Sequence, residues 1–109
     1  IQLLAVGRHL RLKTGEKVIV GRNQEENNKL LSMKDEYDVI MSVKDYHGPI
    51  AIIPHSASKE AIAKAASICA RYSDAPQNTE VIVRYHIGGK VYTVHTKAAD
   101  DIELDGLRI

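Results

Sequence analysis

The chain has 109 residues, of which 44% are hydrophobic and 27% charged, and its formal net charge at pH 7 is +1. A chain of this length can bury a sufficient core without disulfides or a structural metal, so these values describe one globular domain. No apolar run approaches the roughly 20 residues of a membrane span, and the first residues lack the pattern of a signal peptide. A single cysteine, Cys69, excludes an internal disulfide and a thiolate zinc cluster, which indicates a reducing, cytoplasmic compartment. Because the chain opens on Ile1, we expect it to be the C-terminal fragment of a longer protein.

Charge is distributed unevenly along the chain. Residues 1–34 carry seven basic side chains against three acidic ones, a net charge of +4, whereas residues 98–109 carry one against four, a net charge of −3. A basic surface attracts phosphate, but domains that bind nucleic acid without sequence preference usually have a larger excess of basic residues. Charge alone therefore gives only weak support to a nucleic-acid partner.

The first third of the chain predicts a hairpin followed by a short helix. Residues 3–13 alternate between apolar and basic side chains, with Arg8 interrupting the apolar face. A glycine-containing turn leads into a second apolar run, so residues 3–22 are predicted to form a hairpin. A helix is predicted over residues 24–33, because Asn23 can cap its start and acidic residues occupy its first turn.

The middle of the chain predicts two central strands and a longer helix. Residues 38–44 and 49–54 are nearly all apolar, which is typical of strands that are covered on both faces, and they flank a turn. Ser56 or Ser58 can cap the helix that follows. Small apolar residues recur in it at helical spacing, and Pro76 prevents its continuation.

The last third contains the clearest hairpin signal, Gly88-Gly89 between two alternating strands. A two-residue loop fixes the register, which predicts the following cross-strand pairs: Ile87 with Lys90, Tyr85 with Tyr92, Val83 with Val94, Arg84 with Thr93, and His86 with Val91. The resulting order, ββαββαββ, predicts an α+β domain with a largely antiparallel sheet of about six strands and two helices.

Motifs of catalysis or cofactor binding do not occur in the sequence. It contains neither G-x-x-x-x-G-K-[ST] nor G-x-G-x-x-G. Its five histidines lack the H-x-x-x-H spacing, and Cys69 lies on the small-residue face of a predicted helix, where burial makes a thiol inert. Four acidic residues flank strands at turns, where acidic residues are common: Asp35, Glu36, Asp38 and Asp45. We therefore expect no enzymatic activity, cofactor or metal in this domain.

Several motifs occur in an order that is typical of one family. The string VGRNQEENNKLL contains a GRN-x-x-[Q/E]-N-x-x-L element, and a strand begun by Asp38, a turn at Gly48 and an Ala-Ala helix ending near Tyr72-Ser73 follow it. Over residues 17–85 the chain thereby resembles the NFACT-R family, a family of RNA-binding domains.

The resemblance implies RNA as the partner. Together with the basic strand ahead of the motif, it identifies as candidate RNA-binding residues Arg22, Asn23, Asn27, Gly21, Arg11, His9, Lys13 and Gly48. The chain departs from many members at Ile40 and Ser42, where they have an aromatic residue and a histidine, so activities that need those side chains are not implied.

The sequence GRHLRLK ahead of the motif is similar to one form of this domain in particular. That form is fused to the C-terminal end of PP-loop ATPases of the tRNA thiouridylase type. The similarity implies tRNA as the RNA and the remainder of a parent PP-loop ATPase as a second partner.

Arg22 and Asn23 have two interpretations that the sequence leaves open. At a corner between a strand and a helix, they can present a guanidinium, an amide and the free backbone amides of the helix to one phosphate. Alternatively, Asn23 only caps the helix and Arg22 pairs with Glu26. The basic residues of the first strand also have two interpretations. They can contact RNA phosphates, or they can simply form the solvent-exposed face of a strand, which is commonly basic or polar.

Stacking of RNA bases on aromatic side chains is not favoured, because the chain has no Trp or Phe and Tyr85 and Tyr92 face each other on a predicted sheet. Recognition of folded RNA through shape and phosphates fits the composition better. The leading hypothesis is a non-catalytic module that binds RNA and positions tRNA for a thiolation enzyme. The alternatives are a ribosome-associated module of the quality-control type, a protein-interaction or dimerisation domain, and a small hydrolase or RNA-modifying enzyme.

Overall fold

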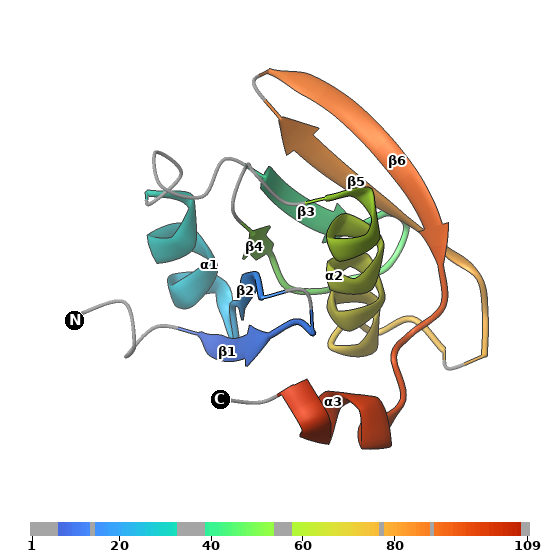
Figure 1. The fold of residues 1–109 in the computed structure, drawn as a ribbon. Coiled ribbons are helices and arrows are strands. Elements are labelled where there is room, and N and C mark those ends of the chain that lie inside the picture. The colour runs from blue at the N-terminus through green and yellow to red at the C-terminus, as the bar shows by residue number, and fades with distance from the viewer. Residues whose placement is uncertain are drawn as a thin grey trace.

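The computed structural model describes residues 7–13, 15–32, 39–53, 58–76, 78–87 and 89–107. These residues form an antiparallel sheet with helices on both of its faces (Figure 1). The strands, in chain order, are β1 (Arg8–Arg11), β2 (Lys17–Val20), β3 (Val39–Val43), β4 (Ala51–Ile53), β5 (Val81–Ile87) and β6 (Lys90–Thr96). The helices are α1 (Gln24–Leu31), α2 (Lys59–Arg71) and α3 (Asp101–Leu107). The prediction of an α+β domain with an antiparallel sheet of six strands is confirmed.

The spatial order of the strands is β1-β2-β4-β3-β5-β6. The hairpin predicted in the first third is confirmed as β1 and β2, in which Arg11 pairs with Lys17. The two apolar strands, β3 and β4, are central as predicted. The structure also has every cross-strand pair predicted for the last hairpin, because its short loop leaves β5 and β6 only one register.

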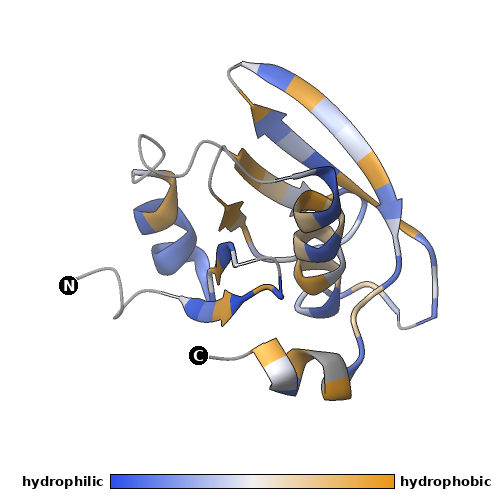
Figure 2. Ribbon diagram, in the orientation of Figure 1, coloured by the Kyte–Doolittle hydropathy of each residue, from blue (hydrophilic) through white to orange (hydrophobic). Residues whose placement is uncertain are grey.

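Alternation along the strands divides the core between the two faces of the sheet. One face, covered by α2 and α3, holds the larger cluster of buried apolar side chains, among them Leu10, Val20, Met41 and Val83. On the opposite face, Leu30 of α1 packs against Ile19 of β2 and Ile52 of β4. Figure 2 shows the alternation of apolar and polar residues along β6, part of whose surface no helix covers.

The second helix is confirmed, and its cap is Ser58, whose Oγ accepts a hydrogen bond from the Ala61 N–H (3.1 Å). Ser56, the other candidate cap, lies outside the described residues. Small side chains on α2 let the helix lie close to the sheet. Cys69 is fully buried there, and burial raises the pKa of its thiol to about 12, so the structural interpretation of this cysteine is confirmed.

The third helix is a correction to the prediction of two helices. Residues 98–109 read as an acidic tail, but α3 buries Leu104 and Leu107, which are spaced three residues apart, and lies beside β1 (Figure 1). A backbone hydrogen bond from Ala99 to the Ser67 carbonyl (3.0 Å) ties the segment before α3 to α2. Contact with the domain therefore stabilises a helix whose own sequence gives a weak signal.

Some predicted elements extend beyond the described residues. Residues 3–6 of the strand predicted over residues 3–13 and the last residue of the helix predicted over residues 24–33 fall there. In the described residues, no helix has the length and apolar composition needed to cross a membrane.

Candidate nucleic-acid interface

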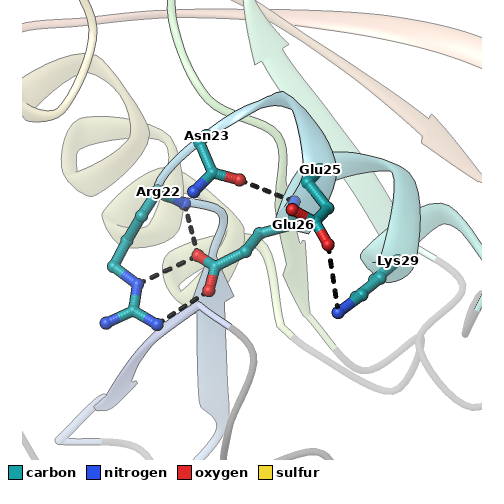
Figure 3. Close-up of polar contacts among 5 residues, drawn as sticks. All are labelled: Arg22, Asn23, Glu25, Glu26 and Lys29. Atoms are coloured by element: carbon teal, nitrogen blue, oxygen red, sulfur yellow. Dashed lines mark hydrogen bonds and ion pairs between the residues drawn. The ribbon is translucent and has the colours of Figure 1, made fainter.

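The corner between β2 and α1 contains the GRN element, and Asn23 caps the helix there. Its Oδ1 accepts a hydrogen bond from the Glu26 backbone N–H at 2.9 Å (Figure 3). Asn23 has an extended backbone, as an N-cap residue requires. The capping role expected for Asn23 is therefore present in the structure.

Arg22 forms an ion pair with Glu26 through two side-chain hydrogen bonds. Nε of Arg22 donates to Oε1 of Glu26 at 2.9 Å and Nη2 donates to Oε2 at 2.7 Å, while the Arg22 backbone N–H donates to Oε1 at 2.9 Å (Figure 3). The hydrogen bond from Arg22 is the main cause that lowers the pKa of Glu26 to about 2. The carboxylate therefore stays ionised, and it holds the guanidinium in one orientation.

One edge of the Arg22 guanidinium remains available. The side chain is 49% exposed, whereas that of Glu26 is 12% exposed. Nη1 makes no hydrogen bond to the part of the chain that the structure describes, and Figure 3 shows it on the side away from Glu26. The ion pair thus orients Arg22 and still leaves N–H groups that can bind an anion.

Asn27 joins this corner to the segment ahead of β4. It is buried, and its Oδ1 accepts a hydrogen bond from the Ile50 N–H at 3.2 Å. The Gly21 N–H donates to the Ile50 carbonyl at 2.9 Å. A Cβ atom at Gly21 would overlap Asn27 Oδ1, so this close approach requires glycine. Both residues of the motif have a structural role at this position.

Gly48 allows a second close approach, between the β3–β4 turn and the end of α2. A Cβ atom at Gly48 would lie 2.6 Å from the Cβ of Ser73. The Asp74 N–H donates a hydrogen bond to the His47 carbonyl at 2.8 Å, which fixes the two segments together. Glycine at this position therefore lets the residues after α2 reach the corner.

A cavity of about 270 Å³ opens where these segments meet. Its walls come from β1, the β2–α1 corner, the β3–β4 turn and the residues that follow α2. The lining residues are Arg8, Gly21, Arg22, Asn23, Gln24, Asn27, His47, Gly48, Pro49, Tyr72 and Asp74. The guanidinium carbon of Arg8 lies 4.4 Å from the centre of the Tyr72 ring, within the range of a cation–π contact.

A family profile described as the NFACT protein RNA binding domain matches residues 7–106. The chain belongs to this family. Its fold is also that of a solved structure, the C-terminal part of the fibronectin/fibrinogen-binding protein from Streptococcus suis, with a TM-score of 0.82 at 19% sequence identity. The likeness covers 95% of this chain and 49% of that one, so the chain spans about half the length of its structural neighbour. No curated protein matches the sequence.

Membership of the NFACT RNA-binding domains implies RNA as the partner, and the cavity unites most of the residues expected to bind it. Five of them line it, from two separate segments: Gly21, Arg22, Asn23 and Asn27 at the β2–α1 corner, and Gly48 in the β3–β4 turn. The RNA contacts of all the candidates remain a prediction.

The basic strand does not contribute its predicted residues to the cavity. His9, Arg11 and Lys13 are not among the lining residues, and Arg11 donates a hydrogen bond to the Gly15 carbonyl (3.3 Å). The neighbouring Arg8 points to the other face of β1 and lines the cavity. Alternation along the strand explains this difference.

Six lining residues were not predicted from the sequence: Arg8, Gln24, His47, Pro49, Tyr72 and Asp74. The available signal was Arg8, the one basic residue on an otherwise apolar strand face. Two guanidinium groups, one carboxylate, amides and an imidazole can bind both an anion and a ligand with N–H donors. The described residues contain no group of side chains that could hold a metal ion.

Proposed function

We propose that this domain is a non-catalytic RNA-binding module and that it binds the RNA backbone at the corner cavity. The observation that carries the proposal is the convergence of five predicted RNA-binding residues, from two segments far apart in the sequence, on one cavity that also contains a second guanidinium. Family membership supports RNA as the ligand. Arg22 contacts a phosphate through its free Nη1. Arg8, on β1, adds a second positive charge at the same cavity.

The small net charge of the chain favours few phosphate contacts. With a formal charge of +1, the chain has little excess of basic residues with which to neutralise a long stretch of backbone. Its affinity for RNA then depends on salt with a shallow slope, because the slope follows the number of phosphates that are neutralised. Arg22, which Glu26 holds in place, loses little conformational entropy on binding.

We further propose tRNA as the RNA, positioned by this domain for a PP-loop ATPase of the tRNA thiolation type within a longer protein. Support comes from the similarity of the sequence GRHLRLK and the motif after it to the form of the domain fused to such ATPases. A cytoplasmic location belongs to the same proposal. A ribosome-associated role in translation quality control would use the same RNA-binding surface, and a preference for tRNA over ribosomal RNA fragments separates the two.

The test is a fluorescence-anisotropy titration of the chain with tRNA, an RNA duplex and single-stranded RNA at two salt concentrations. Salt-sensitive binding that is tightest for tRNA is expected. Arg22→Ala should weaken binding about 5- to 10-fold, as expected for a lost charged contact. Glu26→Gln should strengthen it, because the change removes the negative charge beside Arg22, while the amide oxygen of Gln still accepts the hydrogen bonds to one oxygen that orient the guanidinium.

Opposite effects of these two substitutions distinguish an RNA contact from a structural ion pair, whose two partners would have effects of the same sign. Arg84→Ala is the matched control, since Arg84 is an exposed arginine on β5, outside the cavity. Absence of binding to any of the three RNAs at micromolar protein would overturn the proposal.

A second candidate is a protein-docking domain, and exposed apolar side chains on β6 favour it. Val91 is 56% exposed and Tyr92 43% exposed. The structural neighbour is named for binding fibronectin and fibrinogen, but at 19% identity it shares only the fold. If the domain binds a protein partner with an affinity that high salt does not reduce, and binds no RNA, this candidate would be favoured.

A further inference from the structure

Arg8 and Tyr72 form a platform at the cavity wall, in which the guanidinium lies over the tyrosine ring. Tyr72 is half-buried, and its ring packs against the larger core cluster. Arg8 is exposed and lies over that ring, with its guanidinium carbon 4.4 Å from the ring centre. A guanidinium is planar. While one of its faces contacts the Tyr72 ring, a flat group such as a nucleotide base can stack on the other face.

Arg8 is available for such contact. The structure gives its guanidinium no hydrogen bond and no ion pair within the described part of the chain, only the contact with Tyr72. It is also the side chain that breaks the apolar alternation of its strand. Neither a core role nor a salt bridge accounts for it, whereas RNA-binding proteins stack unpaired bases on arginine planes and on tyrosine rings.

The size of the cavity fits one nucleotide. Its volume of about 270 Å³ lies just below the range of about 300–1,000 Å³ that is typical of pockets for small molecules. A single nucleotide base matches that size better than a stacked run of bases does. Arg22 lies at the same cavity, so a base on Arg8 and a phosphate at Arg22 can belong to the same short stretch of RNA.

The polar wall of the cavity favours one kind of base. The side chain of Asp74 has no partner among the described residues, and an ionised carboxylate only accepts hydrogen bonds. Guanine presents two adjacent N–H donors, N1–H and the N2 amino group, to a carboxylate, whereas uracil presents one. The Asn23 and Gln24 amides complete the wall.

We propose, on the basis of the RNA-binding function above, that the cavity takes one unpaired nucleotide of the bound RNA, with its base stacked on the Arg8–Tyr72 platform and guanine preferred through Asp74. The domain therefore recognises RNA at a bulge or loop, where a base is free to leave the helix. This differs from the expectation of recognition through shape and phosphates alone. The difference arises because Tyr72, far from Arg8 in the sequence, was not foreseen as a cavity residue.

The test uses five RNA hairpins with one common stem, four of them with a single bulged nucleotide, G, A, C or U, and the fifth fully paired. The chain should bind the G-bulge hairpin about 5- to 10-fold more tightly than the paired hairpin, as stacking of one base implies. Arg8→Lys keeps the charge and removes the plane. It should abolish the preference for the bulge, so that the variant binds the bulged and the paired hairpins with equal affinity.

Two further variants complete the test. Arg84→Lys is the matched control, the same exchange at an exposed site away from the cavity, and should alter neither affinity. Asp74→Asn should reduce the advantage of the G bulge over the A bulge. Because Arg8 and Asp74 are exposed, neither substitution depends on repacking of the core.

Three outcomes overturn the inference in distinguishable ways. Equal affinity of the wild-type chain for bulged and paired hairpins would leave RNA binding intact and remove the nucleotide site. An Arg8→Lys variant that keeps the bulge preference would remove the platform. A chain that binds neither kind of hairpin would overturn the proposed function together with this inference.

Discussion

The corner around the cavity and the β5–β6 hairpin are built in opposite ways. In the hairpin, seven residues of each strand pair through a short loop, so every contact across the pair is local in sequence. In the corner, β1 and the GRN element meet the β3–β4 turn and the end of α2, which are far from them and from each other in the chain. A single substitution in the hairpin is therefore expected to disturb only its neighbouring cross-strand pairs. The corner depends on a few positions where two segments nearly touch.

The largest expected effect comes from a methyl group added in the corner. Gly21→Ala would direct a Cβ atom into Asn27 Oδ1 and disturb its hydrogen bond to Ile50, so we expect a loss of about 3 kcal/mol in the free energy of unfolding. Thermal unfolding followed by circular dichroism measures the effect, which corresponds to a fall in Tm of more than about 10 °C for a domain of this size.

The matched change in the hairpin is Gly89→Ala. Gly89 has a φ of +85°, and no atom lies within 4 Å of the position that a Cβ atom would take, so only backbone strain opposes the substitution. A cost of about 1 kcal/mol is expected. If both substitutions cost the same, the corner would not be the more tightly packed region.

A smaller effect is expected when the cap of α1 is removed. Asn23→Ala loses the hydrogen bond to the Glu26 N–H and should cost about 1 kcal/mol, measured by urea denaturation. Asn23→Asp keeps an equally good cap and adds a negative charge at the cavity. It should retain the stability and weaken RNA binding, which separates the structural role of this residue from its proposed role in binding.

The pH dependence of stability tests the Arg22–Glu26 pair. The pKa of Glu26 is lowered from its ordinary value of 4.5 to about 2 in the folded chain, so the native state binds its proton less readily than the unfolded state. The contribution of the pair is therefore complete above about pH 4.5 and is lost as the pH falls toward 2. We expect about 1 kcal/mol, since solvent screens the half-exposed arginine.

Glu26→Gln isolates this contribution. The variant should lose the part of the pH dependence that falls between about pH 4.5 and 2, in urea titrations at several pH values. Identical pH profiles for the variant and the wild type would show that the ion pair does not contribute to stability.

The two regions also differ in how far the sequence predicts them. The register of the hairpin was predicted completely, because loop length and alternation are local properties. The Asn23 cap was predicted for the same reason. The contact of Arg8 with Tyr72 and that of Gly48 with Ser73 depend on how separate elements pack, and no local pattern encodes such distances.

The candidate site was therefore predicted in part. The residues of its GRN motif could be named from the sequence, but the cavity wall formed by Arg8 and Tyr72 could not. The residues predicted on the same strand as Arg8 are not among the lining residues of the cavity. α3 was missed for a related reason, since Leu104 and Leu107 gain their stability from the core that they cover. Predictions failed where a residue's role depends on a distant partner.

The smallest expected effect lies in the hairpin region. The carboxylate of Glu80, just ahead of β5, is 3.2 Å from Nδ1 of His95 on β6, and both side chains are largely exposed. Glu80→Gln should change the free energy of unfolding by less than about 0.5 kcal/mol, because water and salt screen an exposed pair. Urea denaturation beside Glu26→Gln makes the comparison direct. An effect of Glu80→Gln equal to that of Glu26→Gln would mean that the orientation of Arg22 by its carboxylate adds nothing beyond ordinary surface attraction.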